Sequence, residues 1–378
     1  MRNRRSIGAR AVVLTLSAAL ATLGIAAAQD PSPKTASKVA VPKGKVKKGG
    51  LLAPGGAKGK ALRKAAHDPL AGAEAAGKAA TAAPPAPGTF HYALKIVAAD
   101  GTPLASTFYP SRLGTGAAVV ILVHERDRSS KDFEEKVADL QGKGLAEYLQ
   151  KQGYAVLAID LRGQGANVRR TLNQKDWRMM VGDLQSAYLF LVDRHNRGEI
   201  NLSRLGMVAL GEGANLAAVW ASLPGGAVSS QGRTTDLGGL VLISPMIDAQ
   251  SQGLRAQQPI TTLAPRIPLC LLVGERDAAS ADLVKAAKAA VTRVRSNKVE
   301  LFPSSLHGFK LLRLEPNVTT TITRFFDETI KAKAEEWEPR YNMDPITYTG
   351  VRMIPNTSQT PADAPKAAEA ATKKDEAK

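Results

Sequence analysis

The stretch VALGEGANLAAVWA, residues 208–221, decides the fold of this chain. Its first residues are apolar, as in a strand that is buried on both faces. Gly211 and Gly213 then mark a sharp turn, and the residues from Ala214 onward have the small and apolar composition of a helix. A strand, a tight turn and a helix form the repeating unit of sheets covered by helices, so we expect an α/β protein.

The same alternation extends along the chain on both sides of this stretch. Residues 92–110 contain two strand-like runs joined at Asp100 and Gly101, which predicts an antiparallel hairpin at the start. Further strands are predicted at residues 117–125, 154–165, 205–211, 239–245, 267–274 and 298–304. Helices are predicted at residues 144–152, 183–196, 214–222, 281–295 and 319–336. This order predicts a doubly wound, mostly parallel sheet of eight strands.

The composition places most of the positive charge outside the predicted sheet. The 378 residues carry a net charge of +17, and 44% are apolar, 22% charged and 5% aromatic. Residues 1–88 contain 15 Lys and Arg against 3 Asp and Glu, so they carry +12 of this charge. The rest has the composition of an ordinary folded protein. Because few aromatic residues are present to stack on bases, nucleic acid is not an expected partner.

The first 28 residues have the pattern of a signal peptide. Four arginines precede an apolar run at residues 11–28, and Ala26 and Ala28 supply the small side chains that a signal peptidase requires. We expect cleavage near Ala28 and export to the periplasm or the extracellular space. If the run stays uncleaved, its length is close to that of a membrane anchor.

Two further segments are expected to be disordered. Residues 29–88 are mostly Ala, Lys, Pro and Gly, and residues 355–378 are charge-balanced and poor in large apolar side chains. Neither segment can bury enough surface to offset its ordering entropy. The basic segment is interpreted as a solvated spacer, with tethering to an anionic envelope polymer or a membrane surface as the alternative. Between them we expect one domain at residues 89–335 and a C-terminal extension of unassigned structure at residues 336–354.

Polar residues follow three of the predicted strands. The glycine turn follows the strand at 205–211, Asp277 follows the strand at 267–274, and His307 follows the strand at 298–304. The carboxyl ends of parallel strands meet at one edge of a sheet. In this order the chain resembles the α/β-hydrolase superfamily, in which the nucleophile, the acid and the histidine occur in the same succession. The resemblance implies a fold shared with serine hydrolases, esterases and dienelactone hydrolases.

The resemblance also implies a position for the nucleophile. When the family motif G-x-S-x-G is aligned with GEGAN at residues 211–215, Gly213 stands where the serine is expected and Asn215 replaces the last glycine. Glycine adopts the strained backbone of this turn without a Cβ clash. The turn is therefore expected to persist without its hydroxyl, leaving Asp277 and His307 as a vestigial acid and base.

Other interpretations of these residues stay open. Asp277 could simply cap the helix that follows it, and His307 could be a hydrogen-bonded loop residue. Asp248 is the alternative acid, because some relatives place the carboxylate after the preceding strand. Ser244 is the alternative nucleophile, although a packing or capping role is favoured for it. Taken together at the strand ends, Asp277 and His307 favour an acid–base pair.

The oxyanion side departs from the family pattern as well. Hydrolases often have glycine after the histidine that ends the third strand, and Glu125 follows His124 here. The Ala214 N–H could donate to an oxyanion, but a Glu125 carboxylate would oppose the developing negative charge unless Arg126 or Arg128 neutralises it. A surface ion-pair cluster is the favoured interpretation of this loop.

Together these features predict an exported α/β-hydrolase-like protein of impaired catalysis, a pseudoenzyme that acts as a binding or scaffold module in the cell envelope. A small-molecule ligand is expected in the cleft at the strand ends. The alternative is an active hydrolase of ester-type small molecules with a non-standard nucleophile, or with His307 and Asp277 as a general base. No cofactor or metal is expected, because the histidines lack metal-ligand spacing. The lone cysteine, Cys270, lies in an apolar run and can form no internal disulfide.

Overall fold

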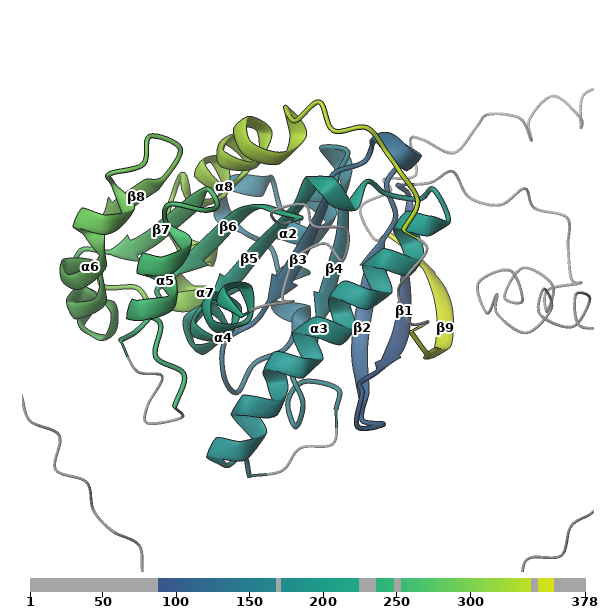
Figure 1. Cartoon of the computed structure of the whole chain (residues 1–378), viewed down its shortest axis with the longest axis horizontal. Coiled ribbons are helices and arrows are strands. Elements are labelled where there is room, and N and C mark those ends of the chain that lie inside the picture. The colour runs from purple at the N-terminus through teal and green to yellow at the C-terminus, as the bar shows by residue number, and fades with distance from the viewer. Residues whose placement is uncertain (1–87, 168–170, 224–235, 248–252, 341–345, 357–378) are drawn as a thin grey trace, which may run out of the picture. The chain divides into compact units, whose positions relative to one another are not determined.

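The computed structural model describes residues 88–167, 171–223, 236–247, 253–340 and 346–356. The predicted signal peptide at 1–28, the basic segment up to residue 87, Asp248 and the tail from residue 357 lie outside the described residues. Within the described part of the chain, the strands form one mostly parallel sheet with helices on both faces, as predicted (Figure 1).

The sheet has nine strands in the order β8-β7-β6-β5-β3-β4-β2-β1-β9. Their bounds are β1 Phe90–Val97, β2 Pro103–Tyr109, β3 Val119–Val123, β4 Ala155–Ile159, β5 Leu205–Leu210, β6 Leu237–Ile243, β7 Leu269–Gly274, β8 Lys298–Phe302 and β9 Tyr348–Pro355. The strands from β3 to β8 are parallel, whereas β1, β2 and β9 pair antiparallel. Every residue of β3, β4, β5, β6 and β7 is buried, which explains their continuous apolar sequences.

Two layers of helices cover this sheet. Their bounds are α2 Leu145–Lys151, α3 Gln174–Asn196, α4 Gly211–Ser222, α5 Gln257–Leu263, α6 Ala278–Val291, α7 Gly308–Leu314 and α8 Val318–Phe326, which continues as a π-helical turn at Asp327–Lys331. Helices α3, α4, α5 and α6 pack side by side on one face, and α2, α7 and α8 pack on the other. Alternate residues of each central strand enter the two apolar cores, as the period of two requires. Among the described residues, no helix is long and apolar enough to cross a membrane.

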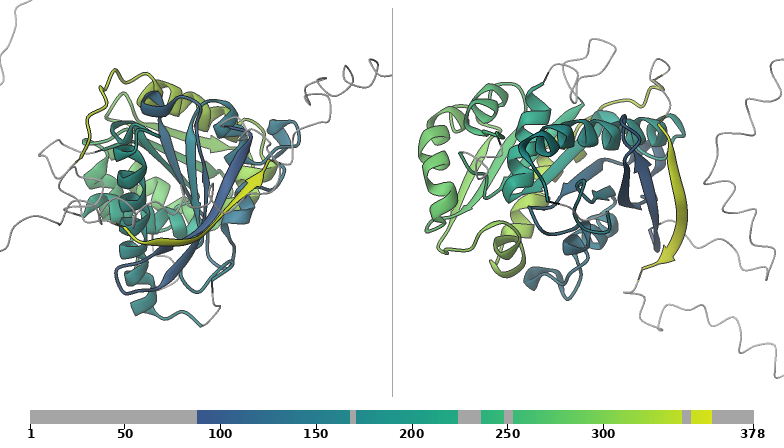
Figure 2. Two further views of the ribbon diagram at one scale, coloured as in Figure 1. Left: turned by 90° about the vertical axis from the view of Figure 1, so that its right-hand side faces the viewer. Right: turned by 90° about the horizontal axis from the view of Figure 1, so that it is seen from below.

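The ninth strand is the main difference from the sequence-based prediction of eight strands. β9 pairs antiparallel with β1 from Phe90↔Pro355 to Ile96↔Tyr348 and forms the edge of the sheet. Figure 2 shows β9 in yellow beside β1. Its sequence, YTGVRMIP, has only one buried residue, Tyr348, and therefore lacks the apolar run that marked the central strands.

The chain before β9 is held to the core by polar contacts. The Arg340 guanidinium pairs with Asp236 through two hydrogen bonds of 2.6 Å, and Tyr188 donates to the same carboxylate at 2.6 Å. The Trp337 indole donates to the His195 carbonyl at 3.0 Å, and the His195 ring bonds to the Glu338 carbonyl at 2.7 Å. These contacts fix residues 337–340 against the C-terminal end of α3. His195 thus has a structural role.

Candidate active site

Two titratable side chains meet at the carboxyl ends of β7 and β8. Asp277 follows β7, His307 follows β8, and the His307 Nδ1 lies 2.8 Å from Asp277 Oδ2. Since the carboxylate only accepts, the Nδ1–H of His307 donates and Nε2 is the ring nitrogen left for other partners. The Asp277 side chain is 3% exposed and that of His307 32%. A buried acid therefore orients a histidine that reaches solvent.

Asp277 also caps the helix that follows it. Its Oδ1 accepts the N–H of Ala279 in the first turn of α6 at 3.2 Å, and its Oδ2 accepts the Ser280 hydroxyl at 2.9 Å. The capping interpretation and the acid–base interpretation of Asp277 are therefore compatible, because Oδ1 caps α6 while Oδ2 accepts from both the Ser280 hydroxyl and the His307 Nδ1–H.

The charges of this pair support one another. Burial by itself raises the pKa of Asp277, but the hydrogen bonds from His307 and Ser280, together with the nearby Ser244 hydroxyl, outweigh it and lower the pKa. For His307, burial lowers the pKa, while the bond to Asp277 and the charges of Glu125 and Glu212 outweigh burial and raise it. The folded protein therefore favours an imidazolium beside a carboxylate.

This shift predicts a pH dependence of stability. Because the folded pKa of His307 is raised above the ordinary value of 6.5, its charged form stabilises the fold fully below that value. The contribution is lost as the pH rises through the folded pKa. The difference in free energy of unfolding between the wild type and His307→Gln should therefore shrink on titration from about pH 5 to about pH 9. A His307 ring that titrates below 6.5 in NMR spectra would contradict this assignment.

The position of the nucleophile is Gly211, and the alignment that placed it at Gly213 is wrong. Gly211 follows the last residue of β5 directly and has φ +51°, the left-handed conformation of a strained strand-to-helix turn. A Cβ added to Gly211 would lie 3.5 Å from His307 Nε2. A side chain here would point at the histidine, as a nucleophile must.

Gly213 has a packing role instead. It lies inside α4, and a Cβ added there would overlap the backbone carbonyl oxygen of His124. Glycine thus lets the start of α4 approach the end of β3, which is the role of the last glycine in the family motif. The motif reads Ala209, Leu210, Gly211, Glu212, Gly213, so alanine replaces its first glycine and glycine replaces its serine.

Two further assignments shift with this correction. Ala214 is fully buried within α4 and is not the residue after the nucleophile position; Glu212 is. Asn215 is not a replaced glycine, because its amide accepts from the Met246 N–H at 2.9 Å and donates to the carbonyls of Met246 and Leu254 at 2.8 and 2.7 Å. It fixes the chain that leaves β6.

The Glu125 side chain occupies the space beside Gly211. Its Oε2 accepts the backbone N–H of Phe309 at 3.1 Å. A Cβ added to Gly211 would lie 2.9 Å from Glu125 Cβ and 3.1 Å from Oε2, and a Cβ added to Gly308 would overlap Oε2. Glu125 is thus inside the site, whereas the sequence favoured a surface ion-pair cluster for its loop. The side chain is only 16% exposed.

A second carboxylate, that of Glu212, accepts a hydrogen bond from a backbone N–H that an oxyanion hole could use. In this fold the hole combines the N–H after the nucleophile with an N–H from the loop after β3. Here the Arg126 N–H donates to Glu212 Oε2 at 3.3 Å, and the Arg126 side chain lies 3.7 Å from Glu212 Oε1. Glu212 is buried. The Arg126 N–H is therefore already bound to a carboxylate where an oxyanion would need a free donor.

The electrostatics of Glu125 reflect this crowding. Burial raises the pKa of its carboxyl, and the negative charge of Glu212 adds to the rise. The Phe309 N–H, His307 and Arg128 act in the opposite direction without cancelling it. The Arg128 guanidinium lies 3.9 Å from Glu125 Oε1 and 3.9 Å from the centre of the Phe309 ring.

The loop that carries Glu125 is fixed by its neighbours. His124 is fully buried, its Nε2 accepts the Leu161 N–H at 2.9 Å, and its Nδ1 therefore donates to the Glu125 carbonyl at 2.7 Å. Burial lowers the pKa of His124, which keeps its ring neutral. The Asp127 N–H donates to the Gln164 side chain at 2.6 Å. The position of Glu125 is thus set by rigid elements.

The alternative nucleophile does not gain support from its surroundings, and the alternative acid stays a prediction. Ser244 is fully buried, has φ +51°, and its hydroxyl lies near Asp277 without a hydrogen bond of ordinary geometry. It thus lies beside the acid. Asp248 lies outside the described residues.

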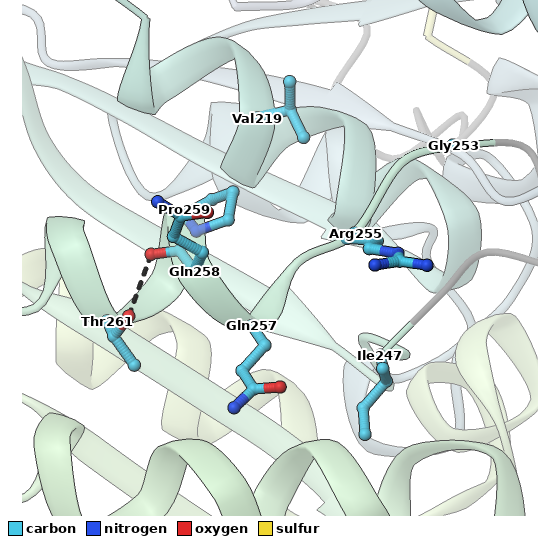
Figure 3. Close-up of a pocket in the computed structure, with 8 residues that line it drawn as sticks. All are labelled: Val219, Ile247, Gly253, Arg255, Gln257, Gln258, Pro259 and Thr261. Carbon is cyan, nitrogen blue, oxygen red and sulfur yellow. Dashed lines mark hydrogen bonds between the residues drawn. The ribbon is translucent and has the colours of Figure 1, made fainter. Parts of the chain in front are cut away.

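A groove of about 790 Å³ lies away from this site, against α4 and α5 (Figure 3). Arg255, Gln257 and Gln258 line it together with Val219 and Ile247. Among the described residues that line it, none is a histidine or a carboxylate that could perform acid–base chemistry. Among the described residues, no cluster of three or more His, Cys, Asp or Glu side chains is arranged to hold a metal ion.

The sheet order, the turn at Gly211, and an acid after β7 with a histidine after β8 define the α/β-hydrolase fold, so the predicted resemblance is confirmed. Residues 116–267 match the profile of a family described as serine aminopeptidase, S33. The match includes Glu125 and Gly211 and ends before Asp277 and His307. It spans less than half of the chain.

Several solved structures are similar to this chain at low identity. An esterase of Pyrococcus furiosus is 18% identical, with a TM-score of 0.47 and coverage of 67% of this chain and 96% of its own. The α/β hydrolase GrgF of a Penicillium species is 11% identical, with a TM-score of 0.48 and coverage of 64% and 99%. A dienelactone hydrolase of Anabaena variabilis is 16% identical, with a TM-score of 0.39 and coverage of 64% and 97%. Among curated proteins, none matches the chain.

Proposed function

We propose that this chain is an α/β-hydrolase-fold protein that no longer performs serine-dependent acyl transfer and instead binds a small molecule at the strand ends. The observation that carries the proposal is Gly211. A side chain at this position would have its Cβ 3.5 Å from His307 Nε2. Because glycine has no side chain, the histidine has no hydroxyl to activate here.

The two carboxylates support the same conclusion. Glu125 fills the space that a substrate carbonyl would enter, and Glu212 holds the Arg126 N–H. A tetrahedral intermediate needs free donors at its oxygen, and removal of one such donor costs about 10²–10³ in rate. Glu125 and Glu212 therefore oppose hydrolysis in addition to the missing serine at Gly211.

The proposal predicts that the purified full-length chain does not react with serine-hydrolase reagents. A fluorophosphonate probe should label it at less than about one part in a hundred of the protein, because no hydroxyl is activated by a base. An active serine esterase under the same conditions serves as the control for the reagent. Stoichiometric labelling would overturn the proposal, and mapping the labelled residue would show which group replaces the serine.

The second candidate is hydrolysis by water activated at His307, which the bond between His307 and Asp277 favours. In that case p-nitrophenyl acetate turnover would survive in the wild type without labelling and disappear in His307→Gln. A role in the cell envelope, through residues 29–88, stays a prediction of the sequence.

A further inference from the structure

Four cations gather where the C-terminal ends of α5 and α6 meet. Arg266 follows α5, Lys288 lies in the last turn of α6, and Arg293 and Arg295 follow α6; all four are exposed. Within the described residues, no hydrogen bond or ion pair joins any of these four side chains to another group. We refer to these four side chains as the basic corner.

A buried asparagine holds this corner together. The Asn297 side chain accepts the Leu269 N–H at 2.9 Å and donates to the carbonyls of Ala264 and Val291 at 2.9 and 3.0 Å. It thus joins the residue after α5, the last residue of α6 and the start of β7, and α5 and α6 lie side by side (Figure 1). The two chain segments that carry the four cations are therefore fixed next to each other.

The two segments that form the corner contain no acidic residue. Residues 253–274 and 283–299 carry seven Lys and Arg and no Asp or Glu. Residues 89–378 together have a net charge of +5, so the rest of that part has a net charge of −2. Two of the seven cations, Lys285 and Lys298, pair with carboxylates outside these segments at 3.5 and 2.8 Å and are not part of the corner.

Helix stability explains only one of the four cations. A cation in the last turn of a helix stabilises its C-terminal end, which accounts for Lys288. Arg266, Arg293 and Arg295 lie beyond the last residues of α5 and α6 and contact no helix carbonyl with their side chains. These three arginines are therefore the part of the corner that indicates an anionic partner.

A line of exposed side chains runs from the basic corner to the groove against α4 and α5. Gln258 lines the groove, and Thr262 and Arg266 follow it at intervals of four residues, which puts them on one side of a helix. Ala264 keeps helical backbone angles where α5 ends, so the line continues toward Arg266. From Gln258 to Arg266 it is about 12 Å long, the length of about four residues of an extended peptide.

We propose that the groove and the basic corner form a docking surface for an acidic peptide segment of a partner protein. The corner binds carboxylate side chains of the segment. The amides of Gln257 and Gln258 in the groove can each donate and accept a hydrogen bond, as a peptide backbone requires. Val219 and Pro259, on opposite walls of the groove, offer apolar surface to one apolar side chain (Figure 3).

The lining favours a peptide over other polyanions. Among the described residues of the groove and the corner, none is aromatic, so the bases of a nucleic acid have no ring on which to stack. Inorganic polyphosphate could pair with the cations but would leave Val219, Ile247 and Pro259 without an apolar partner.

This surface is separate from the candidate active site. The strands β7 and β8 begin at the basic corner and end toward Asp277 and His307, so the corner lies at the opposite end of the sheet. Peptide binding here therefore goes beyond the proposed function and does not depend on the loss of acyl transfer.

The test uses the full-length chain and a fluorescein-labelled peptide of four Glu-Glu-Val repeats, whose binding is followed by fluorescence anisotropy. The wild type should bind it with a Kd of about 1–100 μM, as expected for a small, transient interface. The corner variant Arg266→Glu, Arg293→Glu, Arg295→Glu should raise the Kd about tenfold or more, because three attractive contacts become repulsive. Since these side chains are exposed and unpaired, the Tm should stay at the wild-type value.

A control variant separates this surface from the basic segment at residues 29–88, which also attracts the peptide. Lys95→Glu, Arg324→Glu, Arg352→Glu reverses three exposed cations elsewhere in the domain and changes the net charge by the same amount. Its Kd should differ from that of the wild type by less than about threefold, because salt screens charges that lie far from the bound peptide.

Two further readouts test the groove. Gln258→Glu, which places a negative charge there without changing the size of the side chain, should raise the Kd about threefold or more. A peptide of four Glu-Glu-Gly repeats has the same charge and should bind about threefold or more weakly than the valine peptide, because it has no apolar side chain to bury.

Three results would overturn the proposed surface. One is no binding of the valine peptide at about 200 μM wild-type chain, and another is an equal Kd for the corner variant and the control variant. The third is unchanged binding by Gln258→Glu together with equal binding of the two peptides, which would show attraction by charge alone. None of these results affects the proposed absence of acyl transfer, which the fluorophosphonate probe tests separately.

Discussion

The double variant Gly211→Ser, Glu125→Gly is expected to hydrolyse p-nitrophenyl acetate about 100-fold faster than the wild-type chain. Serine at position 211 would place its Cβ 3.5 Å from His307 Nε2, where the ring already has its acid partner in Asp277. Glycine at position 125 removes the side chain that fills the same space and frees room for the substrate carbonyl.

Neither single change should suffice. With Gly211→Ser alone, the new Cβ would lie 2.9 Å from Glu125 Cβ, which is closer than real side chains approach, and the carboxylate would still oppose an oxyanion. With Glu125→Gly alone, no nucleophile is present. Turnover with p-nitrophenyl acetate is measured for both single variants, for the double variant, and for the double variant with His307→Ala, which should return to background.

Gly213→Ser is the matched control for the position of the nucleophile. Its Cβ would overlap the His124 carbonyl oxygen, so this variant should lose stability and gain no activity. Activity in Gly213→Ser would restore the first alignment. A double variant that folds but does not hydrolyse p-nitrophenyl acetate would show that restoring the serine and removing the Glu125 side chain is not enough for hydrolysis.

The second large effect concerns stability. Asp236→Ala is expected to lower the free energy of unfolding by about 3–5 kcal/mol, because it leaves the buried Arg340 guanidinium without its carboxylate. Tyr188 loses its acceptor at the same time. Urea unfolding measures the change, and Asp282→Ala, on an exposed carboxylate, should stay within about 0.5 kcal/mol of the wild type. A loss as small as that of the control would mean that Arg340 finds another partner when Asp236 is absent.

The central part of the fold could be predicted because the parallel strands are buried on both faces. Continuous apolar runs and glycine turns locate β3 to β7 well from the sequence alone. β9 could not be found in this way, since most of its residues are exposed and its partner strand, β1, lies at the other end of the domain in sequence.

The site shows a different limit of the sequence. Asp277 and His307 could be placed from the strand ends. The nucleophile position depends on the exact residue at which β5 ends, and moving the motif alignment by two residues exchanges Gly211 and Gly213. The alignment with Gly211 at the serine position could have been recognised from the sequence, because it makes Gly213 the last glycine of the motif. The place of Glu125 could not be predicted, since its contact with the Phe309 N–H joins two loops that are far apart in sequence.

The double role of Asp277 affects how such a site changes over generations. Because the same carboxylate caps α6 and holds His307, losing it would weaken the fold even after the reaction has ceased. Selection for a stable protein alone is then enough to keep this aspartate. Its survival in a lineage says little about surviving chemistry, and the histidine, which caps no helix with its side chain, is the more informative residue of the pair.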